Sequence, residues 1–150
     1  MEPTSTRSER SRCVLALLMG ASIAQERNNC SVGGAAAALA VAAERPSDIE
    51  AVVCRGGRPD LATERLRDVR APTLLLVGSK DQAVLELNRN AYFQLTCPRN
   101  LVIVPGATHL FEEPGALDVV GRLASDWFIT HMRPSRADLP ARAGKAEATL

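Results

Sequence analysis

Residues 28–38 read NNCSVGGAAAA. Ser31, one spacer, two glycines and then a run of alanines form the pattern of a turn that leads from a strand into a helix. Such a turn lifts the serine side chain above the end of a sheet, and its tight backbone requires small neighbours. The usual pattern is G-x-S-x-G, whereas Asn29 stands at the first position here. The stretch makes Ser31 a candidate nucleophile and predicts a helix directly after Gly34.

A second candidate turn lies just upstream, where residues 13–24 read CVLALLMGASIA. The apolar residues 13–21 predict a buried strand, and the G-x-S-x-A pattern that follows contains Ser22. The residues before Ser22 match the expected strand more closely than those before Ser31. The glycines and the helical segment after Ser31 match the expected turn and helix more closely, so we rank Ser31 first. The segment also has the outline of a secretory signal peptide, an interpretation that we rank below a core strand. It is too short to span a membrane.

Unbroken apolar segments and helical segments alternate along the chain. Strands without polar alternation are typical of a parallel sheet that is covered on both faces. The sequence therefore predicts an α/β fold, a parallel sheet flanked by helices. The expected strands are 13–21, 49–54, 73–77 and 101–104, and the expected helices are 35–44, 61–69, 83–95 and one from Glu112 to about residue 132. We expect a disordered leader at 1–12, one domain at 13–132 and a flexible tail at 133–150.

Several local patterns give more detailed expectations. The helix at 35–44 is apolar almost all round and should be buried. Asp60 can cap the helix at 61–69, in which Leu61 and Leu66 should point the same way. In the last helix, acidic residues and Pro114 should form the first turn. One buried face of that helix should carry Leu117, Val120, Leu123, Ala124 and Trp127.

Composition excludes some classes of function. The net charge is +1 and aromatic residues make up 3% of the chain, so the clustered cations and stacking rings of a nucleic-acid surface are absent. Four cysteines without a C-x-x-C pair and only two histidines argue against a metal site. We interpret the cysteines as reduced and mostly buried, which favours a cytoplasmic protein. We expect no cofactor, no nucleic-acid partner and no membrane partner.

Three polar residues follow elements whose ends should meet at one edge of the sheet. They are Ser31 in the glycine turn, Asp81 after TLLLVGSK and His109 after LVIVPGAT. Sites in open α/β sheets form beyond the carboxyl ends of the strands. A serine needs a base to take its proton, a histidine can do so near neutral pH, and an aspartate can orient the imidazole. The three residues are therefore candidates for nucleophilic catalysis.

Each candidate also has a structural interpretation. Asp81 could only cap the following helix, and His109 could be a loop histidine with a backbone partner. His131 is better explained by the helix dipole than by a substrate. Arg55 and Arg58 could bind an acidic group, but solvated loop arginines are the simpler interpretation. Gly33-Gly34 before a helix also admits a phosphate or nucleotide site, which we rank low because the P-loop lysine is missing.

Four segments carry a resemblance to a known family: GGAAAALAVAAERP, AVVCRGGRPDLA, PTLLLVGSKDQAVLELN and VPGATHLFEEPGAL. Over residues 31–132 the chain resembles the carboxy-terminal half of dienelactone-hydrolase-like α/β-hydrolases, in a subgroup often fused to phosphoribosyltransferases. The resemblance implies an ester- or lactone-cleaving enzyme that works through an acyl-enzyme. By motif, Ser31 matches the nucleophile, Asp81 the acid and His109 the base. The name-giving enzymes have a cysteine as nucleophile, and a register slip of one would bring Cys30 to that place.

The chain also departs from the family pattern. Only about 30 residues precede Ser31 in this sequence, so we expect the amino-terminal strands of the fold to be missing from it, including the one whose loop helps to build the oxyanion hole. A cut sheet leaves unpaired backbone groups at its edge, so we expect a homodimer or a partner chain to complete it. The alternative is a truncated or degenerate hydrolase fragment without catalytic activity, acting as an interaction module.

Overall fold

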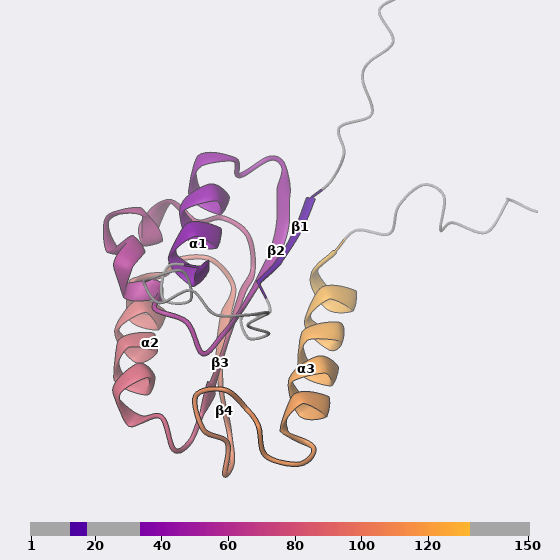
Figure 1. Cartoon of the computed structure of the whole chain (residues 1–150). Coiled ribbons are helices and arrows are strands. Elements are labelled where there is room, and N and C mark those ends of the chain that lie inside the picture. Colours follow the sequence, from indigo (N-terminus) through magenta and orange to yellow (C-terminus); the bar gives the residue numbers. More distant parts are fainter. Residues whose placement is uncertain (1–12, 18–33, 133–150) are drawn as a thin grey trace, which may run out of the picture.

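A parallel sheet of four strands forms the centre of the molecule (Figure 1). The computed structural model describes residues 13–17 and 34–132, so the expected leader and tail, Ser22, Cys30 and Ser31 lie outside the described residues. The strands are β1 (Cys13–Leu17), β2 (Ile49–Arg55), β3 (Thr73–Gly78) and β4 (Arg99–Val104). They lie in chain order, and every neighbouring pair is parallel. The predicted α/β architecture is confirmed.

Helical segments cover both faces of the sheet. Helix α1 (Gly34–Glu44), the 3-10 segment η1 (Pro59–Asp68) and helix α2 (Gln82–Gln94) lie on one face, and helix α3 (Ala116–His131) lies on the other (Figure 1). All four strands and the helices at 35–44 and 83–95 occur within a few residues of their predicted places. The alternation of apolar and helical segments in the sequence therefore predicted the sheet and its covering helices correctly.

The register of the sheet brings two loops together. Strand β3 is paired on both sides and is buried at all six positions. Its last residue, Gly78, lies opposite Val104 at the end of β4, and Leu76 lies opposite Arg55 at the end of β2. Because parallel strands end at a common edge, the loops that follow β2, β3 and β4 meet there.

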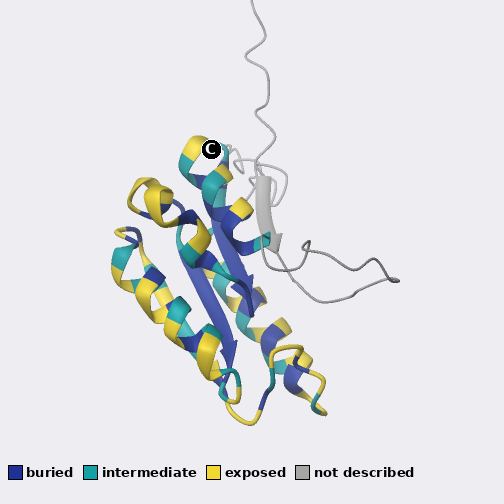
Figure 2. Cartoon of the chain, turned by 60° about the vertical axis from the view of Figure 1, so that its left-hand side comes forward, coloured by how far each residue is buried: buried dark blue, intermediate teal, exposed yellow. Residues whose placement is uncertain are grey.

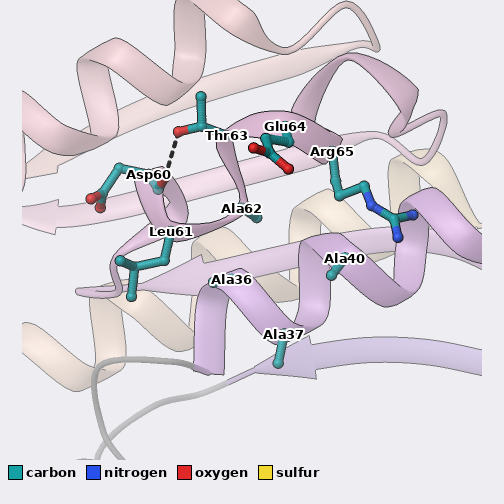
Figure 3. Close-up of a pocket in the computed structure, with 9 residues that line it drawn as sticks. All are labelled: Ala36, Ala37, Ala40, Asp60, Leu61, Ala62, Thr63, Glu64 and Arg65. Atoms are coloured by element: carbon teal, nitrogen blue, oxygen red, sulfur yellow. Dashed lines mark hydrogen bonds between the residues drawn. The ribbon is translucent and has the colours of Figure 1, made fainter.

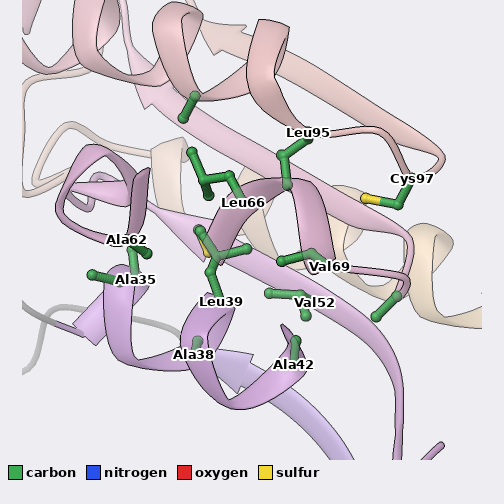
Figure 4. Packing of buried hydrophobic residues seen from close by; sticks show 14 of the residues in the cluster. Ala35, Ala38, Leu39, Ala42, Val52, Ala62, Leu66, Val69, Leu95 and Cys97 are labelled. Carbon is green, nitrogen blue, oxygen red and sulfur yellow. The ribbon is translucent and has the colours of Figure 1, made fainter. Parts of the chain in front are cut away.

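Two apolar cores hold the layers together. The core on the α1 and α2 face, shown in Figure 4, contains Leu39, Val52, Leu66 and Leu75, each with no exposed surface. The core on the α3 face contains Phe111, Val53, Leu76 and Val120, all at most 2% exposed. Burying each such side chain contributes about 1.5–3 kcal/mol. Among the described residues Phe111 is the largest fully buried side chain, in a core that is otherwise mostly aliphatic.

Burial at the margins differs from two predictions (Figure 2). Helix α1 was expected to be buried all round, but Ala37 and Val41 are exposed because only one side of the helix faces β2 and η1. Strand β4 was expected to be buried on both faces, but Ile103 is 38% exposed. Among the described strands β4 pairs only with β3, so the helices cover it incompletely.

The predicted helix at 61–69 is wrong in type and in its cap. Residues 59–68 form 3-10 turns with a kink at Ala62, and Arg58 precedes them without a side-chain cap. Asp60 instead receives two hydrogen bonds from Arg58, at 2.9 and 2.7 Å. Leu66 is fully buried whereas Leu61 is 56% exposed, because 3-10 geometry and the kink rotate the two side chains apart.

The last helix begins later than predicted. Gly115, with φ of +79°, is its N-cap, so Pro114 lies before the helix rather than in its first turn. The predicted buried face is confirmed for Val120 and Ala124, and Leu123 and Trp127 pack partly buried against the same core. Leu117 is 51% exposed and does not belong to that face.

Candidate active site

Asp81 is placed by the turn between β3 and α2. Its backbone N–H donates to the Gly78 carbonyl at 3.1 Å, which closes the turn directly after the strand. Its side chain caps α2, since Oδ1 accepts from the Val84 N–H at 3.4 Å. The other oxygen, Oδ2, lies 2.6 Å from His109 Nδ1. The cap and the contact with histidine, weighed as alternatives from sequence, therefore occur together.

His109 lies in the loop after β4 and is the exposed member of the pair. Its side chain is 49% exposed, whereas that of Asp81 is 14% exposed. An ionised carboxylate can only accept hydrogen bonds, so His109 Nδ1 is the donor in this contact, and in the neutral ring Nε2 then keeps its lone pair. An imidazole held in this tautomer can take a proton at Nε2, which is the arrangement that a general base requires.

Backbone contacts fix the two loops against each other. The Gly106 N–H donates to Ser79 Oγ at 2.8 Å, and the Lys80 N–H donates to the Ala107 carbonyl at 3.0 Å. Gly78 is required here, because a Cβ at this position would lie 2.4 Å from the Ala107 carbonyl oxygen. Asp81 and His109 are therefore held in fixed positions by the loops that carry them.

The glycines after β2 link His109 to the start of α1. A Cβ on Gly56, which has φ of +58°, would lie 3.1 Å from the His109 carbonyl oxygen and 3.8 Å from His109 Cε1. A Cβ on Gly57 would lie 2.3 Å from the Ala35 Cβ. Gly56 and Gly57 therefore lie next to both the His109 loop and Ala35, near the amino-terminal end of α1. This end directly follows the segment that contains Ser31.

Arg55 is buried, which corrects its prediction as a solvated loop residue. It is 4% exposed, its Cζ lies 5.4 Å from the centre of the Phe111 ring, and its Nε has no hydrogen-bond partner within the described part of the chain. Burial lowers the pKa of its guanidinium. The cation–π contact with Phe111 partly compensates the buried charge. Arg58 is occupied by its ion pair with Asp60.

Glu113 is a site residue that sequence reasoning missed. It was expected to begin the last helix, but the helix begins at Ala116 and Glu113 Oε1 accepts from the Thr108 N–H at 3.0 Å. A signal was available in Pro114, since the residue before a proline avoids helical geometry. That rule places Glu113 in the loop, where its carboxylate is free to bind backbone N–H groups.

The two described cysteines with placed side chains are unsuited to nucleophilic chemistry. Cys54 is 1% and Cys97 6% exposed, and burial raises the pKa of the Cys54 thiol to about 12. Burial also raises the pKa of Cys97. These two thiols are free and buried, as predicted. His131 stacks against Trp127 with ring centres 4.1 Å apart, far along α3 from the loops described above.

A surface pocket lies elsewhere, between α1 and η1 (Figure 3). Ala36, Ala37 and Ala40 form one wall, and residues 60–65 form the other. Neither Asp81 nor His109 lines it. Residues 13–17 and 34–132 contain no cluster of metal-ligating side chains and no helix that is long and apolar enough to cross a membrane.

Comparisons with known proteins agree with this fold. No model of a known protein family matches the chain. A dienelactone hydrolase from Anabaena variabilis is 55% identical and superposes with a TM-score of 0.67, over 68% of this chain and 47% of that one. The esterase domain of a Rhodothermus marinus protein superposes with a TM-score of 0.58 at 23% identity, over 65% of this chain and 57% of that one, which supports the fold alone.

The described residues and the comparisons together show a partial α/β-hydrolase fold. Over 68% of its length the chain is similar to the dienelactone hydrolase, so the predicted resemblance is confirmed. Proteins of two strains of Mycobacterium tuberculosis, each named as a candidate phosphoribosyl transferase, are 58% identical over 99 residues. That match covers 66% of this chain but 22% of the relatives, which agrees with a domain that also occurs fused to a phosphoribosyltransferase.

Proposed function

We propose that this chain is a serine-type hydrolase that cleaves an ester or lactone through an acyl-enzyme. The observation that carries the proposal is the 2.6 Å contact between His109 Nδ1 and Asp81 Oδ2, which leaves Nε2 free on an exposed ring. The similarity to a dienelactone hydrolase supports the choice of bond. No step of this reaction requires a cofactor.

Ser31 is the proposed nucleophile. It precedes the first residue of α1 by three positions, and that end of α1 reaches His109 through Gly56 and Gly57. Ser31 Oγ attacks the substrate carbonyl while His109 Nε2 takes its proton. The imidazolium then protonates the leaving alcohol. Water, deprotonated by His109, releases the acid from the acyl-enzyme.

The amino-terminal end of α1 supports the charged intermediate. Helix N–H groups that lack intrahelical partners point outward there, and the helix dipole favours negative charge. An oxyanion formed next to Ser31 would be stabilised by these groups. Removing one such donor costs about 10²–10³ in kcat. The kcat of the proposed enzyme therefore depends on how many N–H groups can donate a hydrogen bond to the oxyanion.

Labelling with a fluorophosphonate probe, followed by peptide mapping, tests the proposal. We expect modification at Ser31, lost in Ser31→Ala and in His109→Gln but kept in Ser125→Ala, which removes an exposed serine of α3. Modification at Ser22 would keep the hydrolase and contradict Ser31 as nucleophile. β1 ends at Leu17, five residues before Ser22, so that outcome would place the turn nearer the strand.

The second candidate function is a hydrolase fragment without turnover that acts as an interaction module. It is favoured by the length of the match, since the chain spans about half of the dienelactone hydrolase and about a fifth of the curated relatives. Absence of labelling in a folded chain would contradict the enzymatic proposal and support this one.

A further inference from the structure

We propose that Glu113 is a positioning residue that holds the backbone next to His109, so that the imidazole keeps its bond to Asp81. This inference rests on the proposed role of His109 as the base. No hydrogen bond or ion pair in the described part of the chain joins Glu113 to the imidazole. It acts on the residue before the histidine, through the 3.0 Å hydrogen bond from the Thr108 N–H to Oε1.

The carboxylate of Glu113 is well prepared as an acceptor. Hydrogen bonds from its own backbone N–H and from that of Thr108 lower its pKa, so the group is ionised at neutral pH. A hydrogen bond to an ionised acceptor is roughly twice as strong as one between neutral groups. The second oxygen, Oε2, is buried without a partner within the described residues.

Glu113 is itself fixed to a rigid element. Its carbonyl accepts from the Ala116 N–H at 3.0 Å, at the first residue of α3. Helix α3 packs on the sheet through Val120 and Ala124. The bond to Thr108 therefore connects the loop that carries the histidine to a packed helix.

His109 lies between two anchored neighbours. On one side is Thr108, held by Glu113. On the other is Phe111, which is fully buried and has φ of +59°, a conformation that a bulky residue adopts only when its surroundings impose it. The Phe111 N–H donates to the Thr108 carbonyl at 3.3 Å and closes the turn around His109. Loss of the Glu113 bond would free one end of this turn and leave the other end fixed.

Three substitutions separate the acceptor from the charge. Glu113→Gln keeps an oxygen at the same reach but removes the charge. Glu113→Asp keeps the charge but withdraws the oxygen by one methylene. Glu113→Ala removes both. Glu112→Ala, at the exposed neighbour, is the matched control.

Two readouts apply to each variant of the full chain. The ¹⁵N shifts of the His109 ring report which nitrogen carries the proton, and ester hydrolysis gives kcat and KM separately. We expect Glu113→Ala and Glu113→Asp to lose the single Nδ1–H tautomer and to lower kcat about 10–100-fold with little change in KM, since small misplacements of catalytic groups have effects of this size. Glu113→Gln keeps the acceptor but weakens the bond, so it should lose clearly less than Glu113→Asp in both readouts. Glu112→Ala should resemble the unsubstituted chain.

Two results would overturn the proposal. One is an unchanged tautomer and kcat in Glu113→Asp. The other is a loss in Glu113→Gln as large as in Glu113→Asp, which would assign the effect to charge. If Glu113→Ala fails to fold, the Gln and Asp variants still decide. If the unsubstituted chain shows no hydrolysis, the proposed function fails, while the ring shifts still test whether Glu113 positions His109.

Discussion

Asp81 shows how one side chain can serve both the fold and the site. Its two oxygens are divided between the Val84 N–H at the start of α2 and the imidazole of His109. The helix cap therefore fixes the carboxylate in the orientation that the histidine needs. Sequence spacing identified both roles and presented them as alternatives, because a pattern of residues does not show that a carboxylate can fill two roles at once.

Substitutions at Asp81 separate these two roles. Asp81→Asn keeps an oxygen for the Val84 N–H, so unfolding in urea should change little. It no longer holds His109 in the required tautomer, and hydrolysis should fall by orders of magnitude, as much as about 10⁴. Asp81→Ala should lose the same activity and also about 1 kcal/mol of unfolding free energy with the cap. Equal urea midpoints for the two variants would contradict a capping role.

Burial of single residues was the least predictable property at this scale. Arg55 was expected in solvent because arginine usually is, but the register of β2 turns its side chain toward Phe111 on the α3 face. Glu113 was expected in the first turn of the last helix, but its carboxylate accepts a hydrogen bond from the Thr108 N–H. The contact of Arg55 joins distant segments that only the folded sheet brings together, whereas the Glu113 bond is local and its signal lay in Pro114.

At the scale of elements, the apolar strands were predictable because their signal is local. The run TLLLVG is central, buried and paired on both sides, as an unbroken apolar segment indicates. The 3-10 turns at 59–68 and the exposure of β4 were missed. A 3-10 turn and a short helix share the same composition, and edge position depends on which strands pair.

The contact of the β3 and β4 loops gives a sharp prediction at Gly78. In Gly78→Ala, the new Cβ would meet two backbone carbonyl oxygens at 2.4 and 2.5 Å, so the loops must separate. We expect a loss of about 1–3 kcal/mol in unfolding free energy, together with the loss of hydrolysis. Gly121→Ala in α3, where nothing lies within 4 Å, should instead stabilise by about 0.5–1 kcal/mol. An active, stable Gly78→Ala protein would show that the contact is dispensable.

The ion pair between Arg58 and Asp60 predicts a pH dependence in η1. The hydrogen bonds from Arg58 lower the pKa of Asp60 in the folded chain, so the unfolded chain binds more protons in the acid range. The stabilisation is complete above the unfolded value, about 3.9. It is lost as the pH falls through the lower folded value. The difference in urea midpoint between the chain and Asp60→Asn should therefore shrink below about pH 4, and an unchanged difference would contradict the prediction.

At the scale of the whole molecule, β1 and β4 are the edge strands of the described sheet. Strand β4 is covered in part by α2 and α3, and Val104 at its end is 2% exposed. Strand β1 pairs with β2, and no other described strand lies beyond it. A free strand edge presents unpaired N–H and C=O groups to any chain that can add a strand. We propose that in this chain the edge of β1 is covered by a second copy or by a partner chain.

Mass action provides the test of this proposal. If a second copy covers β1, light scattering should give a mass above that of one chain, and the urea midpoint should rise between about 1 and 100 µM protein. If a partner chain is required, the isolated chain should bind a hydrophobic dye strongly and lose that signal when the partner is added. A compact monomer that binds no dye at any concentration would contradict both forms of the proposal. The edge would then be covered by this chain itself, and the site around Asp81 and His109 would be assembled within one molecule.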